Sequence, residues 1–413
     1  MDGFSGPERV KWVEESRSVT AGNKPRRWKA HNAHASIASP HRPDRPRVFR
    51  PTEFHEMSSS STPSPGARDR VVLDGSQGEG GGQILRTALT LSLLTGRSFR
   101  MVKIRANRDK PGLRPQHQKA VEAAAALGEA KVAGGGIGAR ELTFSPGAYA
   151  PRDLDIDIGT AGSTGLVLHT LHLPLALRSE GPVRLVLTGG TFNPKAPAFL
   201  FLNATWRAYL AALGMPLSLT MPAAGFYPRG GGRLEAWIEP ATPRPFDQTD
   251  RAPLRTLYGT AGVSNLSEDI ARRMRDRALE RLSAHGLSAE IELVSWPSPG
   301  QGAAIALTAE HDGAIPATFV GLGERGKPSE VVADEAVDQL LAFEAVADAA
   351  VDPHSADQVL LPLSLTPGRS AFTVSEVTEH LRTNASTIRA FLDRSITIEG
   401  SQGEDQPGRV IIE

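Results

Sequence analysis

The sequence contains no cysteine among its 413 residues. Disulfide bridges, thiolate metal ligands and a cysteine nucleophile are therefore excluded, so oxygen and imidazole groups must carry any chemistry. A net charge is also lacking, because 46 Lys and Arg balance 46 Asp and Glu. Any contact with a polyanion must therefore come from local clusters of positive charge. We expect no membrane partner, since no apolar run approaches the roughly 18–20 residues that a transmembrane helix needs. The lack of cysteine fits a cytoplasmic protein.

Residues 1–69 lack the hydrophobic periodicity of a helix or strand. They are rich in Pro, Ser, Arg and His and include a run of Ser and Pro at residues 58–65. Because such a segment buries too little apolar surface to fold, we expect a disordered N-terminal extension. It has neither the apolar core of a secretory signal nor the acid-poor composition of a transit peptide. A translation start at Met57 is our leading explanation for this extension.

Residues 71–86 combine a short apolar run with a glycine cluster. Val71 and Val72 favour a strand, and glycines 80–82 leave a backbone that a ligand can approach closely. The apolar residues from 84 to 93 recur at helical spacing, so the backbone N–H groups at this helix start could face an anion. Glu79 lies in this loop and could hold a metal. A mobile glycine turn with a surface carboxylate has the same pattern, and both interpretations stay open at this point.

The chain after residue 70 repeats one pattern of elements. The first copy has strands near 71–72, 99–104, 130–132 and 141–144, with helices from 84 and over 116–127. The second has strands at 154–158 and 183–187, two more around 225–232, and helices ending near 177 and 213. Both follow the order β-α-β-α-β-β, a split βαβ unit whose helices can cover one face of a four-stranded sheet. An incomplete third copy follows, with a helix around 357–362, a strand at 371–374 and a helix over about 383–392.

Residues 245–340 interrupt this pattern. Strands are predicted at 254–263 and 289–294, and a charged helix over 268–285 with pairs such as Asp269 and Arg273 four residues apart. We therefore predict an α/β (α+β) protein with three repeated β-α-β-α-β-β units in a large domain and an inserted smaller α/β domain. The predicted boundaries are 1–69 for the extension, 70–244 for units 1 and 2, 245–340 for the insertion and 341–413 for unit 3.

Two glycine motifs resemble nucleotide-binding loops and fail in detail. Residues 321–327 match a phosphate-binding loop up to its lysine, but Pro328 follows where a magnesium-binding hydroxyl is needed. Gln83 stands where the dinucleotide fingerprint requires its last glycine. Neither standard nucleotide-binding fold is supported.

Two further features could carry chemistry. Four cations lie within residues 105–114, and Arg105 and Arg108 could converge on one phosphate, although a solvated basic loop has the same pattern. His380 lies at the junction between a strand pattern and a helical one. It is a candidate nucleophile because the sequence offers no cysteine and no Gly-x-Ser-x-Gly elbow. The histidines at 117, 169 and 172 fall within predicted helices and are expected to pack there.

Seven ordered blocks of this sequence resemble the RNA 3′-terminal phosphate cyclase family. They span residues 77–86, 104–117, 159–163, 189–194, 225–232, 356–358 and 380–384. The resemblance implies three repeated units plus an inserted domain, and the ATP-dependent conversion of an RNA 3′-phosphate to a 2′,3′-cyclic phosphodiester. It also implies that a histidine becomes adenylylated and passes AMP to the RNA 3′-phosphate, which the neighbouring 2′-hydroxyl then attacks.

The family motif implies a role for nine positions of this chain. The implied roles are the nucleophile for His380, metal binding for Glu79, phosphate contacts for Arg86, Arg105, Arg108 and Gln116, and nucleotide contacts for His354, Asp357 and Gln358. The implied metal is Mg²⁺ or Mn²⁺, and the implied partner is RNA with a 3′-phosphate end. His354 departs from the pattern, since the family places a tyrosine there that stacks near the nucleotide. An imidazole can stack too, so activity with an altered nucleotide preference is expected.

Two alternatives come from other functional classes. A ribosome-assembly branch of the family keeps the fold without the catalytic histidine, and the presence of His380, Arg105 and Arg108 argues against it. Enolpyruvyl transferases have similar repeated units but need six of them, while this chain offers three. The sequence does not decide between a monomer and a homodimer.

Overall fold

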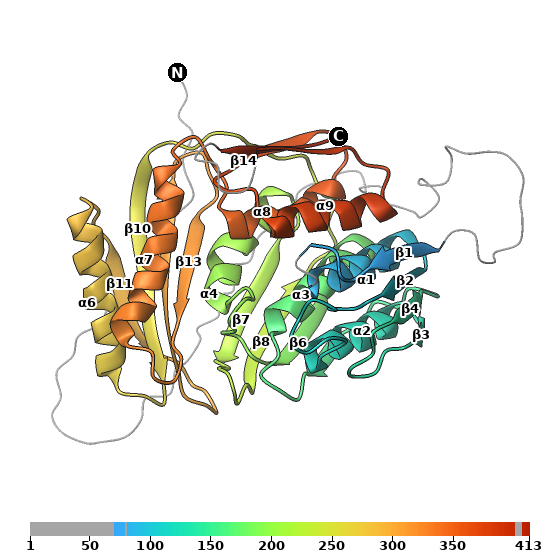
Figure 1. Cartoon of the computed structure of the whole chain (residues 1–413), viewed down its shortest axis with the longest axis horizontal. Coiled ribbons are helices and arrows are strands. Elements are labelled where there is room, and N and C mark those ends of the chain that lie inside the picture. The colour runs from blue at the N-terminus through green and yellow to red at the C-terminus, as the bar shows by residue number, and fades with distance from the viewer. Residues whose placement is uncertain (1–69, 79–80, 401–406) are drawn as a thin grey trace, which may run out of the picture. The chain divides into compact units, whose positions relative to one another are not determined.

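All strands in the described part of the chain fall into four sheets of four strands each. The computed structural model describes residues 70–78, 81–400 and 407–413, which belong to one of the two compact units of the chain. The predicted disordered extension and Glu79 lie outside the described residues. None of the helices in the described ranges is both long enough and apolar enough to cross a membrane. The protein is a mixed α/β structure (Figure 1).

The first sheet follows the predicted order of elements. Its segment runs β1 (Val71–Asp74), α1 (Gln83–Thr95), β2 (Phe99–Val102), α2 (Pro115–Leu127), β3 (Lys131–Ala133) and β4 (Leu142–Ser145). The strands lie in the order β1-β2-β4-β3. β1 and β2 are parallel because α1 connects them as a crossover, whereas the other pairs are antiparallel.

The second sheet has the same topology with a more irregular second helix. Its elements are β5 (Leu154–Asp157), α3 (Thr164–Arg178), β6 (Val183–Gly189), α4 (Phe199–Phe201), the π-helix η2 (Leu202–Trp206), α5 (Arg207–Ala212), β7 (Leu217–Ala223) and β8 (Gly232–Ile238). The order is β5-β6-β8-β7, and β5 pairs parallel with β6. The π-helix widens one turn of an otherwise continuous helical segment.

The third sheet repeats the topology with segments that are distant in the sequence. It contains β9 (Asp247–Gln248), α8 (Pro353–Ser364), β14 (Ser370–Val374), α9 (Glu379–Phe391), β15 (Ile396–Glu399) and β16 (Gly408–Ile412). The order is β9-β14-β16-β15, again with a parallel first pair. The strands β9, β15 and β16 were not predicted from the sequence, and β9 in particular has only two residues, which carry no measurable alternation.

The fourth sheet lies in the chain between β9 and α8. Its elements are β10 (Leu254–Ser264), α6 (Glu268–Ala284), β11 (Glu290–Ser295), β12 (Gly302–His311), β13 (Ala317–Leu322) and α7 (Ser329–Ala345). The strand order is β11-β10-β12-β13. The predicted segment 245–340 thus begins before β9, which belongs to the third sheet, and stops five residues before α7 ends.

The buried apolar side chains form two main cores. One core is shared by the helices and strands of the first three sheets, where α1 packs against both α3 and α9. In Figure 1, α9 lies alongside α1 and α8 lies next to α9, so the C-terminal segment packs against the first helix of the described chain. The second core lies between the fourth sheet and the helices α6 and α7. A small cluster around Phe192, Phe226 and Ala304 joins the second sheet to the fourth.

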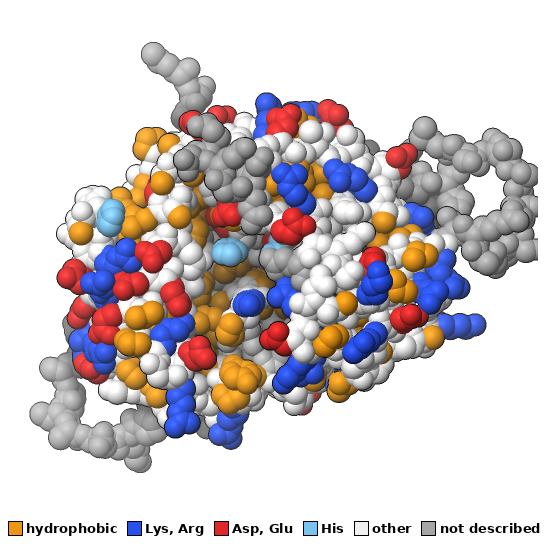
Figure 2. All heavy atoms as spheres, viewed as in Figure 1, with side chains coloured by type: hydrophobic (Ala, Val, Ile, Leu, Met, Phe, Trp, Pro, Cys, Tyr) orange, Lys and Arg blue, Asp and Glu red, His pale blue; other side chains and the backbone are white. Residues whose placement is uncertain are grey.

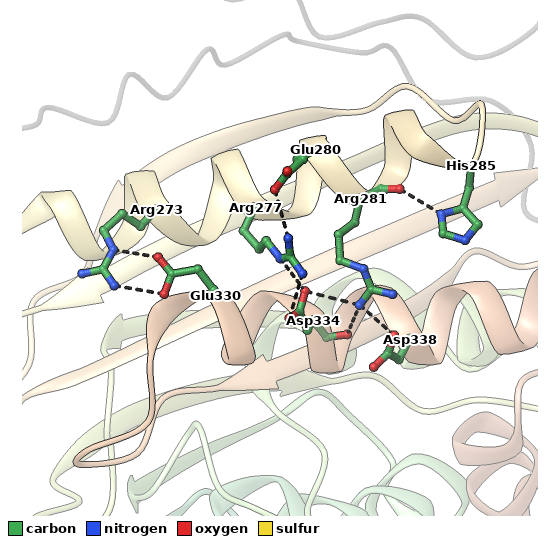
Figure 3. Close-up of polar contacts among 8 residues, drawn as sticks. All are labelled: Arg273, Arg277, Glu280, Arg281, His285, Glu330, Asp334 and Asp338. Carbon is green, nitrogen blue, oxygen red and sulfur yellow. Dashed lines mark hydrogen bonds and ion pairs between the residues drawn. The ribbon is translucent and has the colours of Figure 1, made fainter.

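Ion pairs join α6 to α7 at intervals of one helical turn (Figure 3). Arg273 binds both oxygens of Glu330, at 2.9 and 3.0 Å. Arg277 and Arg281 share the carboxylate of Asp334, at 2.8 and 3.3 Å. The predicted i, i+4 pairing of Asp269 with Arg273 is wrong. The carboxylate of Asp269 pairs with Arg272 instead, because Arg273 is drawn across to α7.

Asp334→Ala tests this ladder of ion pairs. The pairs of Asp334 lie at the surface and are partly exposed, so we expect the free energy of unfolding to fall by only about 1 kcal/mol, measured by urea denaturation at low salt. The loss should shrink in concentrated NaCl because salt screens exposed charges. Asp276→Ala, which removes a carboxylate paired with Arg275 on α6 itself, is the matched control. A loss that does not respond to salt would contradict this description.

Candidate active site

A cavity of about 710 Å³ lies where segments from all parts of the described chain meet. Its walls come from α1, α2, α3, the loop between β6 and α4, η2, β13, α7, α8 and α9. Figure 2 shows the molecule hollowed near the centre of one face, with histidine and Lys or Arg side chains along the hollow. The volume is that of a typical small-molecule site.

The structure brings the sequence-predicted residues together. Eight of the nine line this one cavity, namely Arg86, Arg105, Arg108, Gln116, His354, Asp357, Gln358 and His380. The ninth, Glu79, lies outside the described residues, but Gly81, two positions later, lines the same cavity. No cluster of three or more potential metal ligands occurs within residues 70–78, 81–400 and 407–413. The predicted metal site therefore remains a prediction.

A chain of hydrogen bonds links Asp357, Gln83 and His380. Gln83 Nε2 donates to Asp357 Oδ2 at 3.0 Å. Gln83 Oε1 lies 3.3 Å from His380 Nδ1, across 297 positions of sequence. A carboxylate can only accept, so it holds the amide nitrogen of Gln83 and turns the amide oxygen toward the imidazole. The oxygen can only accept as well. His380 therefore carries its proton on Nδ1 and its lone pair on Nε2, which is the tautomer of a nucleophile that reacts through Nε2.

The helix that carries His380 begins earlier than predicted. α9 starts at Glu379, because the Thr378 side chain accepts from the backbone nitrogen of Leu381 and caps the helix there. His380 thus lies in the first helical turn and not at a strand end. The glycine loop packs directly on this helix, since a Cβ on Gly78 would collide with the side chain of Thr383. Gly78 has a φ of +55°, which further favours glycine there.

Asn384 fixes α9 against the two helices opposite. Thr87 Oγ1 on α1 donates to Asn384 Oδ1 at 2.8 Å, and Asn384 Nδ2 donates to the backbone oxygen of Asp357 on α8 at 2.7 Å. These polar groups are largely buried, so each pairing offsets a desolvation cost. The sequence analysis did not assign Gln83, Thr87 or Asn384, because no local pattern reveals a bond between residues nearly 300 positions apart.

The cavity concentrates positive charge. Burial lowers the pKa of Arg86 to about 10, while Asp357 opposes the shift, so Arg86 stays charged at neutral pH. Burial and the neighbouring Arg108 and Arg114 lower the pKa of Arg105. Gly82 allows this crowding, because a Cβ there would lie 2.8 Å from Arg86 Nη1 and collide with His117. A bound anion would stabilise a cluster of buried cations of this kind.

Four helices direct their N-terminal turns at the cavity. The residues involved are Gln83 on α1, Gln116 on α2, His354 on α8 and His380 on α9. The N-terminal end of a helix carries a partial positive charge and unsatisfied N–H groups, so each turn adds to the attraction for an anion. The arrangement suits a polyphosphate.

The second sheet contributes wall residues that sequence reasoning did not assign. The ring of His169 stacks on Trp206 with centroids 4.1 Å apart, and Trp206 is the last residue of η2. Within the described chain, His169 Nε2, Trp206 Nε1 and Asn193 Oδ1 are buried without a hydrogen-bond partner. All three residues line the cavity, so a ligand has polar groups to meet on this side. A π-helix has no sequence pattern that would have predicted this wall.

Comparison with known proteins identifies the family. A family model described as RNA 3′-terminal phosphate cyclase matches residues 77–398. Proteins named RNA 3′-terminal phosphate cyclase from Caldivirga maquilingensis and Ralstonia nicotianae are each 42% identical to this chain, over 79% and 80% of it and 94% of each relative. One from Archaeoglobus fulgidus is 39% identical over 80% of this chain and 98% of the relative.

The chain belongs to the RNA 3′-terminal phosphate cyclase family.

The cyclase-family blocks fall into two structural groups. The blocks 77–86, 104–117, 189–194, 356–358 and 380–384 contribute residues to the cavity. Block 159–163 lies behind it, where Gln116 Oε1 accepts from the backbone nitrogen of Ser163 at 3.0 Å. Block 225–232, between β7 and β8, does not line the cavity.

Three histidines near the cavity are held neutral by burial. Burial lowers the pKa values of His117, His169 and His172 to about 3 each, and the arginines around His117 lower its pKa further. Consistent with the sequence analysis, all three lie in helices and pack there. The unfolded chain binds protons at these imidazoles below a pKa of about 6.5 while the folded protein does not. Stability should therefore fall as the pH drops from about 6.5 toward 3.

His172→Leu tests this linkage. His172 is fully buried against Trp206, so removing it removes one proton that the unfolded state takes up. Between pH 6 and 4 the free energy of unfolding should fall less steeply in the variant, by up to about 1.4 kcal/mol per pH unit. Urea denaturation at several pH values measures both slopes. Equal slopes in the two proteins would show that His172 is not held neutral.

Proposed function

We propose that this chain converts an RNA 3′-phosphate to a 2′,3′-cyclic phosphodiester in an ATP-dependent reaction through a covalent histidine–AMP intermediate. The observation that carries the proposal is the Asp357–Gln83–His380 chain of hydrogen bonds, which leaves the lone pair of His380 on Nε2. Family membership supports the overall reaction.

The chemistry proceeds by replacing a poor leaving group with a good one. His380 Nε2 attacks the α-phosphorus of ATP, forming a P–N bond and releasing diphosphate. An oxygen of the RNA 3′-phosphate then takes the adenylyl group and the P–N bond breaks. The 2′-hydroxyl finally attacks the 3′-phosphorus, which closes the cyclic diester and releases AMP. Covalent catalysis thus divides one slow displacement into easier steps.

We assign phosphate binding to the residues on the α1 and α2 side of the cavity. Arg86, Arg105 and Arg108 supply charge, and arginine can hold two phosphate oxygens at once. Gln116 uses its Oε1 on Ser163, so its NH₂ group is the part it can offer to a phosphate. This group of donors can neutralise the diphosphate as it leaves.

We assign nucleotide binding to α8. Asp352 caps this helix, which places His354, Asp357 and Gln358 in its first two turns. Gln358 Nε2 donates to the backbone oxygen of His354, and within the described chain Gln358 Oε1 is buried without a partner. This acceptor suits the amino group of adenine.

Glu79, on the glycine loop, is the residue that we propose as the ligand of Mg²⁺ or Mn²⁺. The metal ion would neutralise negative charge on the ATP oxygens.

A second part of the proposal concerns the domain organisation of the chain. We infer that the first three sheets are copies of one β-α-β-α-β-β unit, since they share one strand order and a parallel first pair. Residues 254–345 are then an inserted domain, because they separate β9 from the rest of the third unit and have their own core.

His380→Ala provides the experiment that tests the function. With radiolabelled ATP and Mg²⁺ or Mn²⁺, the wild-type protein should form an acid-labile, hydroxylamine-sensitive AMP adduct and convert an RNA 3′-phosphate to a phosphatase-resistant end. Both should disappear in the variant, because no other nucleophile occupies that position. An adduct that persists in the variant would remove the assignment.

Gln83→Leu tests the positioning role of the amide. The variant keeps the size of the side chain but no longer fixes the tautomer of His380, so we expect adduct formation to slow by about tenfold or more. Binding of ATP, measured by calorimetry, should change little. Gln118→Leu on α2 is a matched control outside the cavity wall. An unchanged adenylylation rate with Gln83→Leu would contradict the role proposed for the amide.

His354→Tyr tests the nucleotide assignment. A phenol ring offers more stacking area than imidazole, so ATP affinity should increase by a few-fold and the ratio of ATP to GTP use should shift. Competition between the two nucleotides in the adenylylation assay measures this ratio. If neither affinity nor preference changes, His354 does not contact the base.

A further inference from the structure

The turn between β7 and β8 carries a cyclase-family block that does not line the cavity. Its Phe226 is only 4% exposed and stacks on Phe192, with ring centroids 4.8 Å apart and planes within 5°. The backbone nitrogen of Gly230 donates to the oxygen of Phe226 at 2.7 Å and closes the turn. The residues between them, 227–229, are therefore held on a rigid base.

This turn packs against the loop that lies behind the cavity wall. A Cβ on Gly230, whose φ is +65°, would lie 2.6 Å from Ala161 Cα, so the turn rests directly on the loop 159–163. The backbone oxygen of Ala161 accepts in turn from Asn193 Nδ2 at 2.5 Å. Asn193 and the next residues, including Lys195, line the cavity. Asn193 and Ala161 thus connect the cavity lining to the turn through direct contacts.

The side chains at the tip of the turn are exposed to solvent and available to bind a ligand. Tyr227 is 73% exposed, more than any other large hydrophobic side chain in the described chain. Arg229 lays its stem against Gly300, where a Cβ would be 3.2 Å away. Within residues 70–78, 81–400 and 407–413, neither Arg229 nor Lys195 has a hydrogen bond or ion pair through its side chain. A rigid turn therefore presents one aromatic ring and one cation, with a second cation in the nearby cavity wall.

We propose that Tyr227, Arg229 and Lys195 bind the single-stranded RNA that leads to the reacting 3′ end. A base of the strand stacks on Tyr227, and its phosphates contact Arg229 outside the cavity and Lys195 in the wall. Aromatic rings interleaved with cations are the chemistry that binds single-stranded RNA without sequence preference. This inference rests on the proposed function, because the terminal phosphate must enter the cavity to meet His380 while the rest of the strand leaves by its mouth.

The experiment compares substrates of different length. Tyr227→Ala and Arg229→Ala should each raise the KM for a long single-stranded RNA 3′-phosphate by about tenfold, in line with the loss of one stacked base or one phosphate contact. The kcat, the KM for a dinucleotide 3′-phosphate and adduct formation without RNA should not change. Tyr227→Phe should behave as wild type because it keeps the ring. Arg229→Ala should also reduce the dependence of RNA binding on salt concentration.

Direct binding separates this inference from the proposed function. Fluorescence anisotropy with the long RNA 3′-phosphate should show weaker binding to Tyr227→Ala and Arg229→Ala. Tyr258→Ala on β10 and Arg272→Ala on α6 are controls of the same residue types. If the wild-type protein forms no AMP adduct but these binding losses appear, the proposed RNA-binding surface is supported and the proposed reaction is refuted. If RNA binding is unchanged, or light scattering shows that Tyr227→Ala instead dissociates an oligomer, the RNA surface is overturned.

Discussion

The candidate active site depends on hydrogen bonds between the first helix of the described chain and its last two helices. Asp357 on α8 orients Gln83 on α1, and Gln83 orients His380 on α9, across sequence separations of 274 and 297 positions. A free imidazole exchanges its proton between two nitrogens, whereas this arrangement selects one tautomer. The proposed nucleophile, His380, therefore has its tautomer set by the fold before a substrate arrives. Asn384 supports the same three helices and limits their movement.

The scaffold explains how distant segments reach this point. Three sheets of identical strand order place their helices in one shared core, so that the N-terminal turns of helices from different units meet around a single cavity. The segment of the first sheet contributes the arginines, and that of the third sheet contributes the imidazole of His380 and the cavity residues of α8. The second contributes a wall of aromatic and amide groups. The three segments share one strand order but differ in side chains, so each lines a different side of the cavity.

Local features of this fold follow from the sequence, and long-range ones do not. Helix α6 was predicted to within one residue because it is long and its charged residues recur at helical spacing, and β10 was predicted because it is itself a strand of eleven residues. β9 escaped prediction because two residues contain no period. The start of α9 was placed four residues late because the capping role of Thr378 was overlooked.

In the candidate site, too, the sequence indicated the residues but not the long-range contacts between them. The resemblance marked eight residues that the structure gathers in one cavity, but it gave no distances between them. Gln83 was used only to reject a dinucleotide motif, yet its amide joins Asp357 to His380. The bond could not be predicted from spacing because it depends on how α1, α8 and α9 pack. Likewise, the wall around Trp206 follows from a π-helix, which depends on tertiary packing.

The most direct test of the central claim is to locate the adenylyl group on the protein. The wild-type chain would be incubated with ATP and a divalent metal in the absence of RNA, digested at mildly alkaline pH and mapped by mass spectrometry. The arrangement of Asp357, Gln83 and His380 predicts AMP on the peptide that contains His380, attached through the imidazole. AMP on a lysine, or on any other histidine, would contradict the account.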